Sequence, residues 1–157
     1  MNTTVKKAST GEVISINISE KRGTEKKQVP EANLIAGFGV EGDAHGGDWD
    51  RQISIFPVEA LVKVPEEKKE EVLNGGYTEN ITIQGLSLED LSIGSRVKIG
   101  SAEVDILHIG KDEYKEHGRP YIVSREGRFG RVVKSGKISI GDQVHVARRC
   151  FASQIER

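Results

Sequence analysis

The sequence contains almost no cysteine, and this scarcity excludes several kinds of protein. Cys150 is the single cysteine among 157 residues, so the chain has no intrachain disulfide, cysteine-based zinc finger or two-cysteine redox motif. Low cysteine content also favours a reducing compartment. We therefore expect a cytoplasmic protein.

Long apolar runs and an excess of charge of one sign are also missing. No run approaches the roughly 18 apolar residues of a membrane-spanning helix, and residues 1–8 lack the apolar core of a signal peptide. The 23 Lys and Arg residues nearly balance the 24 Asp and Glu residues, which leaves a net charge of -1. Nucleic-acid binding depends on a basic surface. We therefore expect neither a membrane nor a nucleic acid as partner.

Aromatic residues are scarce, whereas glycine is abundant. Aromatics make up 5% of the chain and there are 18 glycines, so the core must consist of Val, Ile and Leu, and the chain turns often. This composition is typical of a protein built from many short strands. The length fits one domain with one hydrophobic core. We predict a single domain over residues 1–157, with its core at about 11–146 and a C-terminal tail at 147–157.

Alternation of apolar and polar residues predicts the strands. In the first strand, Ile14, Ile16 and Ile18 fall on one face. Gly100 and Ser101 link two later strands and suit a type II′ hairpin. The predicted strands are residues 12–18, 52–56, 80–84, 96–99, 102–109 and 143–146.

Other segments lack this alternation. We predict one or two short helices between residues 59 and 73, a single helical turn at 88–91, and an exposed loop over the charged residues 20–30. Residues 92–99 and 139–146 share a Ser-Ile-Gly turn that leads into an alternating strand. Two equivalent turns of this kind, with evenly spaced short strands, favour a closed or nearly closed β-barrel. The predicted fold is therefore mainly β, with a few short helices.

The densest polar cluster lies at residues 37–52, directly before a predicted strand. Five glycines are interspersed there with Asp43, His45, Asp48, Asp50 and Arg51. A glycine-rich turn with Asp caps and with Arg51 in an internal ion pair explains these residues. A divalent metal site is the alternative, but no spacing matches a specific motif such as His-Glu-x-x-His. We therefore predict no metal ligands in this cluster.

A second cluster concentrates positive charge in a nearly neutral chain. It comprises Arg119, Arg125, Arg128 and Arg131, with Lys111 and Lys134 nearby. Guanidinium groups bind phosphate or carboxylate through two hydrogen bonds, and glycine neighbours let backbone amides approach an anion. This favours an anion pocket. The alternative is a solvated basic face paired with Glu113, Glu116 and Glu126.

Four segments together resemble the MOSC family, the domain found at the C-terminus of molybdenum cofactor sulfurases and in stand-alone bacterial proteins. They match that family in order and spacing. The segments are residues 39–47 with Arg51 and Gln52, the Glu-Asn-Ile-Thr sequence at 79–82, the strand pair at 91–100, and residues 125–136 followed by 140–144. The resemblance implies a β-barrel of the kind seen in the pyruvate kinase β-barrel domain.

The resemblance also implies a ligand, the molybdenum cofactor (molybdopterin), which is a phosphorylated pterin. The candidates that would bind its phosphate are Arg51, Lys111, Arg125 and Arg131. Asn80 would hydrogen-bond the pterin or the phosphate, and Asp43 with His45 would organise the loop or transfer protons. In an alternative, Arg125 and Arg131 are structural. Their partners would then be Glu79 and Glu126.

The family's reactive cysteine has no counterpart at the matching place. Such a thiolate would carry sulfur and ligate molybdenum, but residues 110–126 contain no cysteine. We therefore expect a carrier or delivery module whose partners are molybdenum cofactor biosynthesis or acceptor enzymes. Two alternatives stay open. One is a sulfur-transfer enzyme that uses Cys150 or a partner's persulfide, and the other is an interaction module without a ligand.

Overall fold

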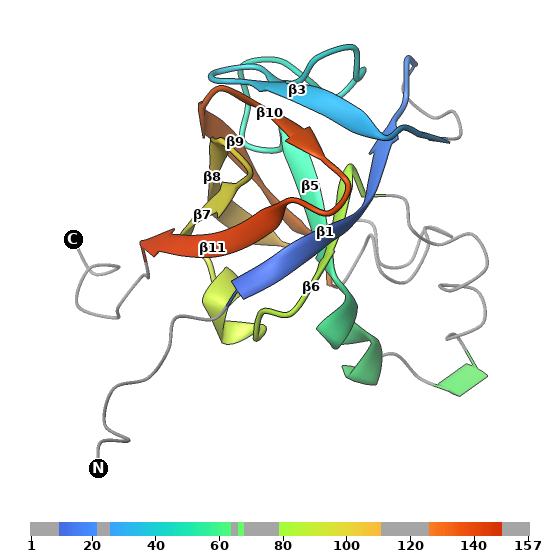
Figure 1. Ribbon diagram of the computed structural model, residues 1–157, viewed down its shortest axis with the longest axis vertical. Helices are drawn as coiled ribbons and strands as arrows, with labels where there is room; N and C mark the ends of the chain where they lie inside the picture. The colour runs from blue at the N-terminus through green and yellow to red at the C-terminus, as the bar shows by residue number, and fades with distance from the viewer. Residues whose placement is uncertain (1–9, 22–25, 64–65, 68–78, 111–125, 149–157) are drawn as a thin grey trace.

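The computed structural model describes residues 10–21, 26–63, 66–67, 79–110 and 126–148. Seven strands form the wall of a β-barrel (Figure 1). Their order is β11 (Gln143–Arg148), β7 (Arg96–Ile99), β8 (Ala102–Ile109), β9 (Arg128–Lys134), β5 (Ile53–Pro57), β6 (Ile81–Gln84) and β1 (Thr10–Ile18). Pairing of β1 with β11 closes the sheet. The prediction of a mainly β barrel is confirmed.

A smaller sheet lies across one end of the barrel. It contains β10 (Gly136–Ser139), β3 (Glu31–Ile35) and β4 (Gly39–Val40), and Figure 1 shows β3 and β10 above the barrel wall. The strand β2 (Lys27–Gln28) pairs with Asn17 and Ile18 at the end of β1. The prediction of an exposed loop over residues 20–30 is therefore wrong at β2, because backbone pairing with β1 needs no apolar pattern. The prediction of a single domain is not tested by this arrangement and stays a prediction.

The predicted hairpin is confirmed. Strands β7 and β8 pair antiparallel, with Ile99 opposite Ala102. Gly100 has φ of +57°, and no non-glycine residue among those described has positive φ. A type I′ turn needs positive φ at both central residues, so Ser101 excludes it and the turn matches type II′. The two Ser-Ile-Gly turns lead into β7 and β11, as predicted. These two strands are neighbours in the wall and pair antiparallel.

Among the described residues, 66 and 67 are α-helical and the other helical segments are two short 3-10 turns. They are η1 (Val58–Lys63), which follows β5 directly, and η2 (Glu89–Leu91), which precedes β7. The predicted helical turn at 88–91 coincides with η2. Most of the predicted helical stretch after residue 63 lies outside the described residues.

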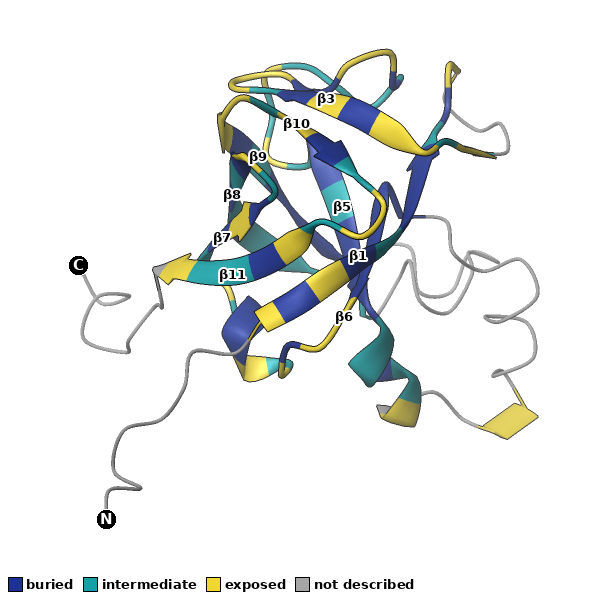
Figure 2. Cartoon of the chain, in the orientation of Figure 1, coloured by how far each residue is buried: buried dark blue, intermediate teal, exposed yellow. Residues whose placement is uncertain are grey.

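The barrel interior is filled by aliphatic side chains, as the scarcity of aromatics implies. Alternate residues of each wall strand point inward, so buried and exposed residues alternate along the strands in Figure 2. In β1 the register shifts between Val13 and Ser15. Val13 and Ile16 are core residues, whereas Ile14 is only half-buried. The prediction of a single Ile14–Ile16–Ile18 face is therefore wrong, because a β-bulge changes which side chains face inward.

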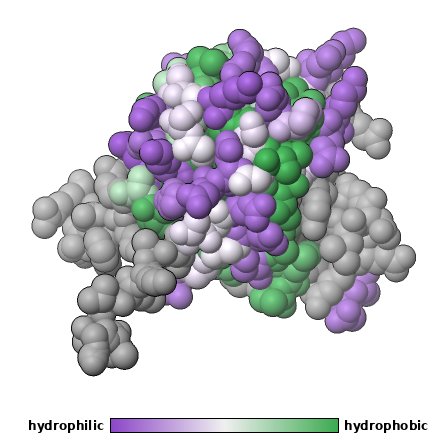
Figure 3. Space-filling view, in the orientation of Figure 1, coloured by the Kyte–Doolittle hydropathy of each residue, from purple (hydrophilic) through white to green (hydrophobic). Residues whose placement is uncertain are grey.

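The surface is mostly polar. In Figure 3 hydrophilic side chains cover much of the visible face, and an apolar band runs beside them. The large apolar side chains exposed in the described part of the chain are Phe38, Val62, Ile93, Val133 and Ile140. None of the helices found in the described ranges has the length and apolar character needed to cross a membrane.

Candidate functional site

The outer side of the barrel carries a row of polar side chains next to the 37–52 loop. The inward residues Ile53, Ile55 and Ile81 pack in the core, so the alternate positions of β5 and β6 face outward. Asn17 on β1 and Asn80 before β6 are nonetheless buried. We call Asn17, Asn80 and Ser54 the polar row.

Hydrogen bonds connect the polar row across three strands. Asn80 accepts bonds at Oδ1 from the Ser54 backbone N–H at 3.0 Å and from Ser54 Oγ at 3.3 Å, and its Nδ2 donates to the Asn17 carbonyl at 3.1 Å. Asn17 Nδ2 in turn donates to the Glu79 carbonyl at 3.1 Å. Asn80 therefore holds β1, β5 and β6 together. Its predicted bond to a pterin or phosphate stays a prediction.

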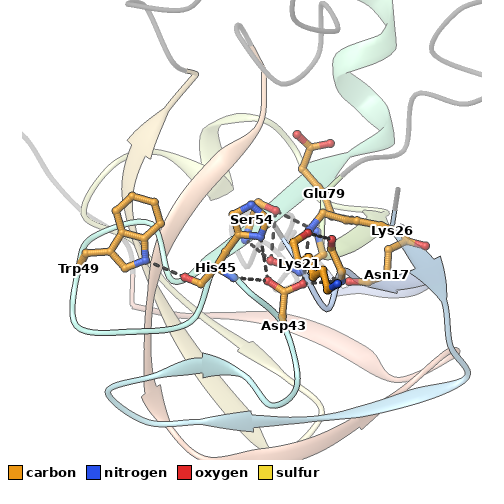
Figure 4. A network of polar contacts seen from close by, with 10 residues as sticks. Asn17, Lys21, Lys26, Asp43, His45, Trp49, Ser54 and Glu79 are labelled. Carbon is orange, nitrogen blue, oxygen red and sulfur yellow. Dashed lines mark hydrogen bonds and ion pairs between the residues drawn. The ribbon is translucent and has the colours of Figure 1, made fainter. Parts of the chain in front are cut away.

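Asp43 lies at one end of this region, with a side chain that is 0% exposed. Its Oδ1 accepts from the Ser19 backbone N–H at 2.8 Å and lies 3.5 Å from Lys26 Nζ. Its Oδ2 accepts from the His45 backbone N–H and lies against His45 Nδ1, both at 3.0 Å. The carboxylate thus ties the loop to the end of β1 (Figure 4).

The surroundings of Asp43 keep it ionised. Burial by itself would raise the pKa of this carboxyl, but the His45 side chain, the two backbone N–H donors and the Lys26 charge lower it more. The pKa therefore lies well below its usual range. An ionised carboxylate only accepts hydrogen bonds.

The backbone of His45 is hydrogen-bonded at both its carbonyl oxygen and its N–H. Trp49 Nε1 donates to the His45 carbonyl at 2.7 Å, while Asp43 binds its N–H. The imidazole is 29% exposed, so it reaches solvent or a ligand. The structure therefore brings the predicted pair Asp43 and His45 together at the surface of the loop.

The opposite side of the loop is fixed by ion pairs to β8 and β9. Arg131 Nε lies 3.1 Å from Asp50 and its Nη1 lies 2.9 Å from Asp48, and these bonds raise the pKa of the guanidinium. His108 Nε2 lies 3.3 Å from Asp50 Oδ2. Arg131 thus has a structural role, with Asp48 and Asp50 as partners. Its predicted binding of phosphate stays a prediction.

Arg51 has a different environment from Arg131. Its guanidinium stacks over the Phe129 ring, 4.7 Å from the centroid, and Nη1 donates to the Gly110 carbonyl at 3.1 Å. Within the described residues no carboxylate neutralises it, so the predicted internal ion pair of Arg51 is not seen there. Phe129 on β9 lies opposite Ser54 on β5 in the sheet. Arg51, which stacks on Phe129, therefore lies beyond the β5 end of the polar row.

The basic cluster is only partly within the described residues. Arg128 is buried and donates to the Glu126 carbonyl at 2.7 Å and to Glu126 Oε1 at 3.4 Å. Burial lowers the pKa of Arg128, and Glu126 opposes that change. Arg128 is thus a buried partner of Glu126 rather than part of a solvated face. Lys111, Arg119, Arg125 and Cys150 lie outside the described residues.

Sequence reasoning missed Lys26, Asn17, Ser19 and Trp49. Lys26, Asn17 and Ser19 act through partners far along the chain, such as Asp43 for Lys26, whereas Trp49 binds His45 four residues away. A charged segment without periodicity gives no sign of which lysine will be buried. In the described ranges no group of His, Cys, Asp and Glu is arranged to hold a metal ion.

A separate groove lies on another part of the barrel, between the start of β1, the end of β6 and η1. Its volume is about 540 Å³, and its polar lining comes from Thr10, Glu12, Glu59, Gln84 and Gln143. No predicted site residue is in this lining. The groove and the 37–52 loop are therefore two different features.

Comparison with known families supports the resemblance seen in the sequence. The MOSC domain model matches residues 41–109. The matched segment contains Asp43, His45, Arg51 and Asn80, and the resemblance to this family is confirmed. The MOSC family is generally associated with the molybdenum cofactor.

Solved structures share the fold at low sequence identity. YuaD from Bacillus subtilis is 20% identical with a TM-score of 0.63, over 89% of this chain and 97% of its own. YiiM from Geobacillus stearothermophilus is 20% identical with a TM-score of 0.63, over 91% and 78%. YiiM from Escherichia coli is 19% identical with a TM-score of 0.60, over 92% and 72%. No curated protein matches the chain.

Proposed function

We propose, from the MOSC match over residues 41–109, that this protein binds the molybdenum cofactor on the outer polar side of its barrel. It then serves as a carrier or delivery module in the cytoplasm, for enzymes that make or receive the cofactor. The cofactor supplies an anionic phosphate, a pterin ring rich in hydrogen-bonding groups, and a metal held by its sulfur atoms.

The proposal rests on one observation. Arg51 and His45 lie on either side of the polar row. Arg51 stacks on Phe129 of β9, and Asp43 beside His45 is bonded to Ser19 after β1. In the sheet β5 and β6 separate β9 from β1. Three strand spacings correspond to about 14 Å. A cation and an imidazole so placed suit an elongated ligand with one anionic end.

The donor set fits the organic part of the cofactor. Arg51 has one of its five N–H groups bonded within the described residues, so others are available for a phosphate. Guanidinium and phosphate form two-point, charge-assisted bonds. The metal is a different matter, because a soft thiolate ligand would have to come from Cys150, which the structure does not describe. The proposal therefore concerns binding of the phosphorylated pterin.

Cofactor binding to the purified full chain tests this proposal. We expect tight binding that weakens at moderate salt, and an Arg51→Ala variant that binds about 10- to 100-fold more weakly, since a bond to a charged group contributes roughly 1.5–3 kcal/mol. Arg51→Lys should fall between the two, because lysine keeps the charge but not the planar donor geometry.

Arg96→Ala is the matched control. It also removes one guanidinium, but Arg96 is paired with Asp105 on β8 at 2.6 Å and not with a residue of the loop. The proposal fails if the unaltered protein does not bind the cofactor, or if Arg96→Ala weakens binding as much as Arg51→Ala does.

The sulfur-transfer alternative is tested with Cys150→Ser. A cis mechanism loses all sulfur transfer in this variant. A carrier keeps its affinity for the cofactor.

A further inference from the structure

The acceptor positions of the Asp43 carboxylate are all occupied. Two donors approach each oxygen: Ser19 N–H and Lys26 Nζ at Oδ1, and the backbone N–H and Nδ1 of His45 at Oδ2. A carboxylate has about four acceptor sites. Asp43 therefore has no site left for a ligand, and the predicted proton-transfer role would belong to His45 alone.

This arrangement determines which imidazole nitrogen of His45 carries hydrogen. Asp43 is ionised and only accepts, so Nδ1 at 3.0 Å must be the donor. In a neutral histidine one nitrogen is a donor and the other an acceptor, and the bond made by one nitrogen sets the state of the other. Nε2 of neutral His45 then carries a free lone pair. Free histidine in water prefers the opposite tautomer, with hydrogen on Nε2.

We propose that Asp43 is a positioning residue that holds His45 in the Nδ1–H tautomer, so that Nε2 accepts a hydrogen bond from an N–H or O–H group of the ligand. The pterin ring and its exocyclic amine carry such donors. This last step rests on the proposed function, whereas the tautomer itself does not.

Two further contacts support a fixed imidazole. Trp49 Nε1 binds the His45 carbonyl at 2.7 Å, which fixes the backbone that carries the ring. Lys26, with a side chain only 13% exposed, supplies the positive charge nearest to Asp43 among the described ion pairs. That charge favours the ionised carboxylate and thus the donor state of Nδ1. Lys26 comes from the segment before β2, so the site is assembled from the loop and two strand ends.

His108 provides a comparison within the same molecule. It faces Asp50 through Nε2, at 3.3 Å, and both side chains are largely exposed. Its carboxylate partner therefore favours hydrogen on Nε2, the opposite tautomer to that of His45. The protein thus contains two Asp–His pairs that favour opposite histidine tautomers.

Nitrogen-15 NMR of imidazole shifts in the purified full chain, without ligand, tests the inference. At a pH at which both histidines are neutral, we expect the Nδ1–H pattern for His45 and the Nε2–H pattern for His108. A His45→Gln spectrum assigns the signals. In Asp43→Ala no carboxylate accepts from the ring, so His45 should lose the Nδ1–H pattern and shift toward the Nε2–H pattern of free histidine.

Asp50→Asn is the control on the other side of the loop and should leave the His45 signals unchanged. The inference is overturned if His45 in the unaltered protein shows the Nε2–H pattern, a result that needs no variant to fold. It is also overturned if a folded Asp43→Ala keeps the Nδ1–H pattern.

Cofactor affinity then separates this inference from the proposed function. If the cofactor binds, Asp43→Ala should weaken binding about tenfold, because Nε2 of His45 would then carry hydrogen and would face a donor of the ligand. Unchanged affinity in a variant with the altered tautomer overturns the role of Nε2. If the cofactor does not bind at all, the proposed function fails, but the Nδ1–H pattern of His45 would still support the tautomer inference.

Discussion

The 37–52 loop supplies the carboxylates of two Asp–His pairs, Asp43 with His45 and Asp50 with His108 of β8, whose surroundings are very different. The Asp43 side chain is 0% exposed and bonded by four donors, whereas Asp50 is 53% exposed and shared between Arg131 and His108. Burial makes hydrogen bonds to a charge stronger and their loss costlier, while water screens the exposed pair. We infer that the Asp43 side shapes the site and that the Asp50 side only restrains the loop.

The largest expected effect is the loss of the buried carboxylate. Asp43→Ala removes the acceptor for Ser19 N–H and leaves Lys26 without its partner, so we expect the free energy of unfolding to fall by about 3 kcal/mol. Urea denaturation measures this change. A loss below about 1 kcal/mol would show that the two sides of the loop contribute equally.

The dependence of stability on pH should also separate the two carboxylates. Asp43 has a folded pKa far below its unfolded value of about 3.9, so its contribution is complete above that value and is lost as the pH falls toward the folded pKa. Between pH 6 and about 3 the unaltered protein should therefore lose more stability than Asp43→Asn. Parallel curves for the two proteins would contradict this assignment.

The smallest expected effect is at the exposed pair. Asp50→Ala should lower the free energy of unfolding by less than about 1 kcal/mol, because solvent screens an ion pair at this exposure. The difference from the unaltered protein should shrink further as salt is added. A loss as large as that of Asp43→Ala would overturn the comparison.

The sequence predicted six of the seven strands of the barrel wall but missed β9 and the small sheet of β3, β4 and β10, and it predicted the contacts of the site poorly. Period-two alternation reports directly on a strand with one buried face, so β5, β6, β7, β8 and β11 were predictable. The bulge in β1 was not, because an extra residue leaves no local mark in an apolar run. The backbone pairing of β2 also lacks a side-chain signal.

The candidate site shows why motifs locate residues without assigning their roles. Asp43 and His45 were predicted together, and the structure brings them into contact. The same reasoning grouped Arg51 with Arg131, but Arg131 is bonded to two carboxylates and Arg51 stacks on Phe129. Partners 81 or 83 residues away decide that difference, and no local pattern contains them.

The closure of the barrel by its first and last strands has a consequence for synthesis on the ribosome. Thr10 pairs with His145, so positions 10 and 145 must meet before the wall is complete. Until β11 leaves the exit tunnel, β1 presents an unpaired edge to other nascent chains. Contacts this far apart in sequence form slowly. Co-translational folding can therefore complete the β7–β8 hairpin early, but the closed barrel only after β11 has left the exit tunnel.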